Sequence, residues 1–177
     1  TNKELVEHVN AAVGHGDYKT AYRQLTTLAE RGDHWAQMVI AAMLSQGTYA
    51  GVPQDHAMGV YWYRKSADQG NVDAQVALGV NYYYGQGVSQ DYANAAKWWH
   101  KAAEQRNTDA QFNLGLLYAN GQGVPKDYAK AFMWYRKAAE QGNAVAQNNL
   151  GVLYRDGKGV SQNRLIAFVW FNIAAAN

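Results

Sequence analysis

The chain of 177 residues has the length of one ordinary domain, enough to bury a hydrophobic core without disulfides or metals. Its 16 Lys and Arg residues are balanced by 14 Asp and Glu and form no basic block, which excludes the electrostatic footprint of a nucleic-acid-binding protein. No run reaches the roughly 18 apolar residues that a membrane-spanning helix needs, and the absence of Cys excludes thiol chemistry and thiolate metal sites.

Apolar side chains recur at helical spacing along the chain. Ala74, Leu78 and Tyr82 follow one another at four-residue intervals, which places them on one face of a helix. The pattern predicts an all-α fold without strands. The expected helices cover residues 4–13, 17–31, 34–46, 55–69, 73–84, 91–105, 109–120, 127–141, 145–156 and 163–176.

The sequence repeats with a period of 36 residues, and each period contains two of the expected helices. The recurring features are an Ala and a Leu-Gly pair in the first helix, a Gly-x-Gly-Val turn, and a Trp followed by an aromatic residue in the second helix. The copies are Ala74, Ala110 and Ala146; Leu78-Gly79, Leu114-Gly115 and Leu150-Gly151; Gly85 to Val88, Gly121 to Val124 and Gly157 to Val160; and Trp62, Trp98, Trp134 and Trp170.

Short polar residues and glycines mark the ends of the expected helices. Asp55, Asp91 and Asp127 stand where a second helix begins, and a carboxylate there can accept the unpaired amide hydrogens of the first turn. The Gly-x-Gly before the last two of these ends a first helix and permits the positive φ angle of a tight reversal. Where other copies have Gly70 and Gly142, one copy has Arg106, and a left-handed conformation there would cost about 1 kcal/mol.

Large aromatic side chains alternate with small ones in the repeat. Gly79, Gly115 and Gly151 follow a Leu on the first helix and allow a second helix to approach closely. The Trp that recurs in each second helix is therefore expected in the core. Trp99 stands where other copies have Tyr, and Trp35 has no equivalent, so both are predicted to be surface anchors.

The last expected helix differs from the earlier second helices. Residues 165–173 are apolar nearly all round, whereas the earlier copies carry Lys, Arg and His on their outer face. The terminal repeat of an array needs a polar outer face for solubility. We therefore expect this helix to be covered, either by further residues or by a second chain, and self-association through it is one form of that prediction.

The pattern Ala-Gln-x-x-Leu-Gly-x-x-Tyr-x-x-Gly-x-Gly-Val-x-x-Asp, followed by Lys-Ala-x-x-Trp-Tyr-x-Lys-Ala-Ala-Glu-x-Gly, resembles the Sel1-like repeat, a relative of the tetratricopeptide repeat. The fullest copy is Ala110 to Asn143. The resemblance implies a right-handed α/α superhelical solenoid of about four hairpins over residues 33–177, with a divergent helical cap or half repeat at residues 1–32. Together these would form a single domain over residues 1–177, with its C-terminal end truncated or covered by a partner.

Proteins that resemble this chain commonly act as adaptors in protein complexes, often in bacterial envelopes. The resemblance therefore implies a non-enzymatic scaffold without a cofactor, which binds a protein or peptide in its concave groove. It also favours the bacterial periplasm or secretion over the cytoplasm. The chain begins with Thr1, which is compatible with a removed signal peptide.

Candidate binding residues are those that vary between copies of the repeat. By similarity to tetratricopeptide grooves, the positions around the Leu-Gly pair face the concave side. Aromatic and Arg side chains make good anchors there, and Asn side chains can bind the amides or terminal carboxylate of a peptide. The predicted site consists of Trp35, Met38, Val76, Tyr83, Phe112, Asn113, Asn148, Asn149, Val152 and Arg155.

Catalytic and metal-binding patterns are weak in this sequence. The five His residues show no metal-ligand spacing, and the Gly-Gln-Gly turns lack the Gly-Lys-Ser/Thr ending of a phosphate loop. Two alternative functions stay open. One is an envelope immunity protein that neutralises a toxin. The other is a protein or enzyme that binds β-lactams or peptidoglycan, although the chain lacks the Cys residues of the branch of the family linked to penicillin binding.

Overall fold

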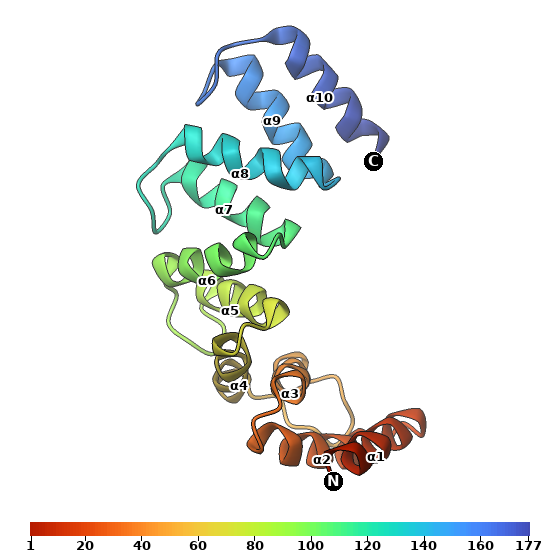
Figure 1. The fold of residues 1–177 in the computed structure, drawn as a ribbon. Helices are drawn as coiled ribbons and strands as arrows, with labels where there is room; N and C mark the ends of the chain where they lie inside the picture. The colour runs from red at the N-terminus through yellow and green to blue at the C-terminus, as the bar shows by residue number, and fades with distance from the viewer. The chain divides into compact units, whose positions relative to one another are not determined.

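The computed structural model describes all residues, Thr1 to Asn177, and contains ten α-helices and no strand, which confirms the predicted all-α fold (Figure 1). The chain divides into two compact units, residues 1–90 and 91–177. The single-domain assignment stays a prediction. The helices are α1 (Asn2–Gly14), α2 (Tyr18–Glu30), α3 (His34–Gln46), α4 (His56–Asp68), α5 (Val72–Tyr84), α6 (Tyr92–Glu104), α7 (Thr108–Asn120), α8 (Tyr128–Glu140), α9 (Ala144–Asp156) and α10 (Arg164–Ala176).

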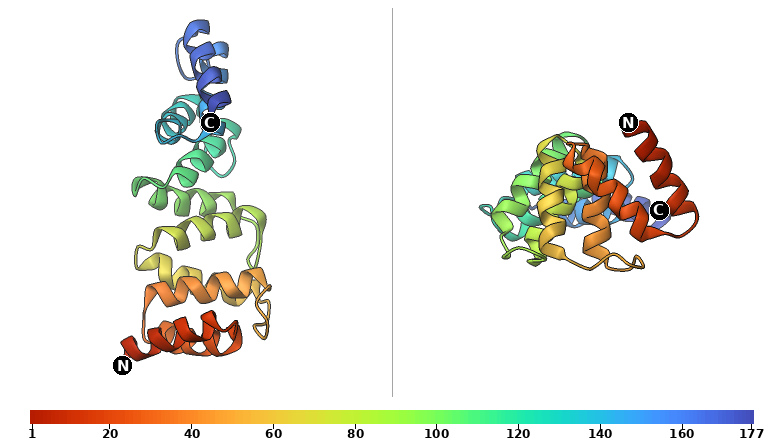
Figure 2. Two further views of the ribbon diagram at one scale, coloured as in Figure 1. Left: turned by 90° about the vertical axis from the view of Figure 1, so that its right-hand side faces the viewer. Right: turned by 90° about the horizontal axis from the view of Figure 1, so that it is seen from below.

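The first unit contains α1 to α5, and each of these helices packs against the next along the chain (Figure 2). Its interior is built from aliphatic side chains that are almost fully buried. The loop between α3 and α4 is also anchored, because Val52 is buried and the ring of Tyr49 lies 5.2 Å from that of Tyr18 on α2. The largest buried side chains of this unit are Leu25, Leu28, Ile40, Leu44 and Leu78.

The second unit contains α6 to α10, with α7–α8 and α9–α10 as hairpins and α8 packed against α9. Figure 1 shows α9 and α10 running side by side in opposite directions. The core consists of small residues of α8 and of leucines of α9 around the ring of Tyr135. Its buried members are Ala131, Tyr135, Ala138, Ala139, Ala146, Leu150 and Leu153.

The predicted helix ends are confirmed. Asp55, Asp91 and Asp127 each accept a hydrogen bond from the backbone amide three residues later, at 2.9 to 3.0 Å, and so cap the second helices. Arg106 has a φ of 66° and is the only residue other than Gly in the left-handed region. The next residue, Asn107, caps α7 by accepting from the amide of Ala110.

Two structural constraints favour Gly at the second glycine of each Gly-x-Gly turn. Gly123 has a φ of 68°, and a Cβ added to it would lie 2.2 Å from the carbonyl carbon of Tyr92. Gly159 has the same relation to Tyr128, at 2.2 Å from its carbonyl oxygen. These turns therefore press against the start of the second helix of the preceding hairpin. The sequence pattern indicated the positive φ angle but not this close approach.

The pairing of Gly with large rings is confirmed inside the second unit. A Cβ on Gly115 would lie 2.5 Å from the ring of Tyr135, and a Cβ on Gly151 would lie 2.5 Å from the ring of Phe171. The recurring Trp residues of α4, α6 and α8 are buried, as predicted. Trp99 is buried as well, at 3% exposed, so its assignment as a surface anchor is wrong. It occupies the same place in its repeat as Tyr135, which is a core position.

The last helix leaves an apolar surface uncovered. Leu165 is 74% exposed and Phe168 is 64% exposed, and only Ala167 of α10 is buried. The prediction that a further element covers this helix stays a prediction. None of the helices has the length and apolar character that crossing a membrane requires.

Candidate functional site

A cleft in the second unit brings together polar and apolar side chains from three consecutive helices. It has a volume of about 260 Å³. We call it the α7–α9 cleft. Its lining consists of Leu116, Ala119 and Asn120 of α7, Tyr128 and Tyr135 of α8, Asn149, Val152 and Leu153 of α9, and Lys158 of the following turn.

Backbone features of the repeat position these side chains. The capping residues Asn107 and Asn143 start α7 and α9, and left-handed Gly121 and Gly157 end them. The contact between Gly159 and the start of α8 brings the neighbouring Lys158 to Tyr128. The Nζ atom of Lys158 lies 5.7 Å from the centre of the Tyr128 ring, and that of Lys126 lies 5.1 Å from the same ring.

The buried ring of Tyr135 and the side chain of Asn149 both line the cleft. Tyr135 is 3% exposed, and burial raises the pKa of its phenol to about 12, although the hydrogen bond with Asn149 acts in the opposite direction. The phenol is therefore neutral at physiological pH.

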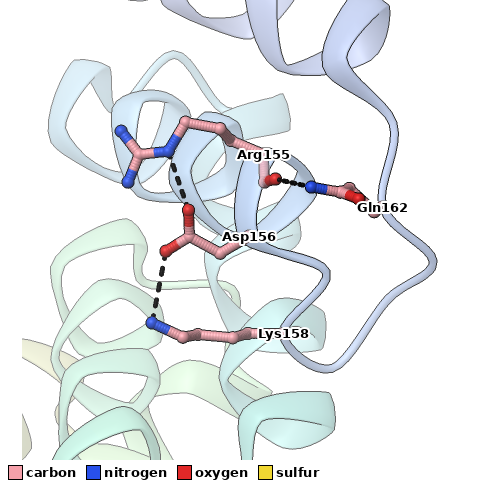
Figure 3. A network of polar contacts seen from close by, with 4 residues as sticks. All are labelled: Arg155, Asp156, Lys158 and Gln162. Carbon is pink, nitrogen blue, oxygen red and sulfur yellow. Dashed lines mark hydrogen bonds and ion pairs between the residues drawn. The ribbon is translucent and has the colours of Figure 1, made fainter.

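The rim of the cleft carries a small ion network at the end of α9 (Figure 3). Asp156 lies between two cations: its Oδ1 is 2.7 Å from Nε of Arg155, and its Oδ2 is 3.2 Å from Nζ of Lys158. Hydrogen bonds from Arg155 and then Lys158 lower the pKa of Asp156, and the same bond to Asp156 raises the pKa of Arg155. Gln162 donates to the carbonyl of Arg155 at 2.7 Å, which ties the next loop to this corner.

The charges of this corner leave a surplus of positive charge. Arg155 and Lys158 share one carboxylate, that of Asp156. Lys126 adds a further cation on the ring of Tyr128. The lining contains no carboxylate and no imidazole. The arrangement suits an apolar side chain on the leucine and valine surface, next to an acceptor group that amides and a cation can reach.

The predicted residues of the first unit lie on α3 and α5. Trp35 is 44% exposed near the start of α3, and Met38 is half-buried one turn later. Val76 and Tyr83 are half-buried on α5, and the ring of Tyr83 lies 4.9 Å from that of Tyr84. A cleft of this unit, with a volume of about 540 Å³, contains none of these four residues and is lined by Asp17, Lys19, Thr20, Tyr22, Arg23, Gly51 and Pro53.

The predicted residues of the second unit fall into three groups. Asn149 and Val152 line the α7–α9 cleft, and Arg155 belongs to the ion network at its rim. Phe112 packs on the core, with its ring 5.9 Å from that of Tyr135. Asn148 lines a different hollow with residues of α10. Asn113 is half-buried on α7.

Sequence reasoning missed several residues of the cleft, among them Asn120, Tyr128 and Lys158. One signal was available for Lys158, because it replaces the Gln that stands between the two glycines in the earlier turns. Tyr128 and Tyr135 carried no such signal, since both recur as parts of the repeat. The structure contains no group of three or more His, Cys, Asp and Glu side chains that could hold a metal ion.

Several solved structures are similar to this chain. A protective antigen of uropathogenic Escherichia coli that displays an SLR fold is 38% identical, with a TM-score of 0.83, over 88% of this chain and 33% of that chain. This chain thus spans about a third of that protein. A Sel1 repeat protein from Oxalobacter formigenes is 32% identical, with a TM-score of 0.85, over 97% of this chain and 68% of that one. The immunity protein PA5088 of Pseudomonas aeruginosa shares the fold at 19% identity and a TM-score of 0.52, over 96% of this chain and 82% of that chain.

The sequence comparisons identify the repeat itself. No curated protein gives a match to the chain. The Sel1 repeat, by contrast, matches four consecutive segments, residues 36–71, 72–107, 108–143 and 144–177. These segments contain α4 to α10 entire and nearly all of α3. The chain therefore belongs to the Sel1 repeat family.

Proposed function

We propose that this chain is a non-enzymatic binding module that holds a segment of a partner protein, with the α7–α9 cleft as its anchor site. The Sel1 repeat fold is typical of protein–protein interaction. The observation that carries the proposal is the copy-specific chemistry of the cleft. Asn149 and Lys158 stand beside an apolar surface there, and Lys158 has no equivalent cation in the two earlier Gly-x-Gly turns, which carry Gln at its position.

A comparison of equivalent positions in successive repeats indicates which cleft residues the repeat needs for its own folding. The position of Lys158 is Gln122 in the preceding repeat and Gln86 in the one before. The position of Asn149 is Asn113 in the preceding repeat and Ala77 in the one before. Because the two earlier turns fold with Gln at the position of Lys158, the repeat does not need this cation for its own packing. The positive charge of Lys158 is therefore available for binding a partner.

The partner segment has a definable chemistry. Leu116, Val152 and Leu153 offer an apolar surface, which favours a medium-sized apolar side chain. The surplus positive charge at Arg155, Lys158 and Lys126 favours a carboxylate next to it. We therefore expect an extended segment with an apolar residue beside an Asp, a Glu or a C-terminal carboxylate. The remaining predicted residues, Phe112, Asn113 and Asn148, would extend the contact surface along α7 and α9.

A library of short random peptides displayed on phage tests this proposal. The chain should enrich peptides in which an acidic group neighbours an apolar residue. Asn149→Asp keeps the size of the side chain and its ability to accept from Tyr135, yet it places a negative charge in the cleft. This variant and Lys158→Glu should each weaken binding of the enriched peptides by about tenfold or more, as measured by calorimetry.

The matched control for Lys158→Glu is Lys97→Glu, which makes the same change of charge on the exposed face of α6, away from the cleft. It should leave binding unchanged. Peptides without an acidic group, or equal losses in the control and in the cleft variants, would contradict the assignment of the site. Circular dichroism of all variants should show the same helix content.

A further inference from the structure

The turn between α6 and α7 contains a backbone conformation that the other turns of this kind reserve for glycine. Arg106 has a φ of 66°. The equivalent residues in the other turns are Gly32, Gly70 and Gly142, with φ values of 91° to 94°. A side chain is strained in this region, because its Cβ crowds a neighbouring carbonyl oxygen. The chain therefore keeps an Arg at this position at a cost in stability.

Packing within the chain does not explain this Arg. A Cβ built on Gly32, Gly70 or Gly142 meets no atom within 4 Å, so a side chain at this place fills no gap. Arg106 itself is exposed, and its guanidinium makes no ion pair and no hydrogen bond with the rest of the chain. Strain that the fold itself does not use is typical of residues that contact a ligand.

Arg106 lines a second cleft of the unit formed by residues 91–177, with a volume of about 310 Å³. We call it the Arg106 cleft. It is formed by the C-terminal ends of the second helices α6 and α8, and it includes the buried Gln111 of α7. The other polar side chains of the lining are Glu104, Lys137, Glu140 and Gln141. This cleft shares no residue with the α7–α9 cleft and does not depend on the proposed function.

The two cations of the Arg106 cleft lack a carboxylate partner. Neither Arg106 nor Lys137 forms an ion pair in the structure. Lys137 lies over the ring of Trp134, with Nζ 4.4 Å from the centre of the ring, and its ammonium group keeps its N–H donors for other partners. The guanidinium of Arg106 presents its N–H groups in a planar fork that matches the two oxygens of a carboxylate. The cleft therefore has an unused capacity to bind an anion.

The acceptors of the cleft indicate which anion fits. Glu104 and Glu140 each pair with a side chain of their own helix through Oε1, at 3.5 and 3.4 Å, and the second oxygen of each has no ion-pair partner. Gln141 donates through Nε2 to Oε1 of Gln111 at 2.7 Å and keeps its own Oε1 as an acceptor. Two carboxylates beside the cations disfavour a doubly charged anion such as phosphate. These acceptors suit a singly charged carboxylate that has an N–H group next to it.

We propose that the Arg106 cleft binds the free carboxylate of an α-amino acid, carried either by the free amino acid or by the C-terminal residue of a peptide. Arg106 and Lys137 contact the carboxylate oxygens. The adjacent N–H group donates to the free oxygens of Glu104, Glu140 or Gln141. A volume of about 310 Å³ lies at the lower end of the range for small-ligand sites and suits one or two residues.

NMR of the Arg Nε–Hε groups of the full chain tests the proposal, with the Arg106 signal identified by its loss in Arg106→Gly. The probes are alanine, N-acetyl-Ala-Ala and its C-terminal amide. The Arg106 signal should shift with one or both carboxylates and not with the amide. The tighter of the two carboxylates identifies a free amino acid or a peptide end as the source. An equal shift with the amide, or tighter binding of inorganic phosphate than of either carboxylate, would overturn the proposal.

Substitutions of Arg106 separate binding from stability. Arg106→Gly should weaken binding of the preferred carboxylate by about tenfold or more, as measured by calorimetry. In urea it should raise the ratio of folded to unfolded chain by about fivefold, because the strain is released. Arg106→Lys keeps the charge without the planar fork and should also weaken binding.

The matched control is Arg164→Gln, which removes an exposed Arg of the same unit that lines neither cleft. It should leave binding of the preferred carboxylate unchanged. Because the equivalent turns already contain Gly, the Arg106→Gly chain is expected to fold. A chain with Arg106→Gly that binds the carboxylate as the unaltered chain does, or carboxylates that leave the Arg106 signal in place, would overturn the proposal.

Discussion

Helices α8 and α10 occupy the same place in successive repeats, yet their surroundings differ. Both begin after a capping residue, and both press an aromatic ring against a Gly of the preceding helix. Tyr135 of α8 is enclosed between α7 and α9, whereas Phe171 of α10 has a neighbour on one side only. The comparison shows that the repeat sequence builds the helix and its first contact, while burial depends on the next hairpin.

The largest expected effect on stability comes from adding a methyl group at the glycines that contact the Tyr135 and Phe171 rings. Gly115→Ala and Gly151→Ala both gain about 1 kcal/mol in helix propensity, and both place a Cβ at 2.5 Å from a ring. Overpacking costs about 1–3 kcal/mol where the ring cannot move. Tyr135 is enclosed, but Phe171 can shift toward solvent. The free energy of unfolding in urea should therefore fall by about 2 kcal/mol more in Gly115→Ala than in Gly151→Ala. Equal losses would mean that α10 is held as rigidly as α8.

The hydroxyl of Tyr135 on α8 makes the stability of the fold depend on pH. Its equivalent on α10, Phe171, has no group that titrates. Because burial raises the pKa of Tyr135 from 10.0 to about 12, the folded state favours the protonated phenol. Its contribution to stability is complete below pH 10 and is lost as the pH rises toward 12. Near pH 11 the loss should be about 1.4 kcal/mol.

The measurement is the change in unfolding free energy between about pH 9 and pH 11, compared between the chain and its Tyr135→Phe variant. The variant carries Phe at this position, as α10 does at Phe171. Between pH 9 and pH 11 its unfolding free energy should fall by about 1.4 kcal/mol less than that of the unaltered chain. Tyr84→Phe, at an exposed ring, is the control and should behave like the unaltered chain. A pH response that Tyr135→Phe leaves unchanged would show that the phenol is not the group involved.

The smallest effect concerns the outer face of α10. Lys137 of α8 lies over the Trp134 ring, with Nζ 4.4 Å from its centre, and the same position in α10 is Ile173. Ile173→Lys would restore this contact over Trp170 and should change stability by about 0.5 kcal/mol or less in the favourable direction. Thermal unfolding of the dilute chain measures it, with Lys137→Ile as the reverse substitution. A clear loss in Ile173→Lys would indicate that the outer face of α10 is buried in solution.

Most of the fold could be predicted because its determinants are local. Helix periodicity, the Asp caps and the turn glycines act within a few residues of one another, and the left-handed Arg106 was expected from the same pattern. The cleft could be predicted only in part. Asn149 and Val152 were expected from their variation between copies, but Tyr128 and Lys158 join them through a contact between a turn and a helix some 30 residues earlier.

The sequence by itself determined which residues form helices, where each helix begins and ends, and which faces are apolar, because backbone hydrogen bonds and side-chain spacing are set along the chain. Only the tertiary structure decided that Trp99 is buried, that Lys158 reaches Tyr128, and that Phe112 packs on the core. The burial of a side chain depends on neighbours that are distant in sequence. Repeats with nearly identical local patterns can therefore differ in what they expose and in what they can bind.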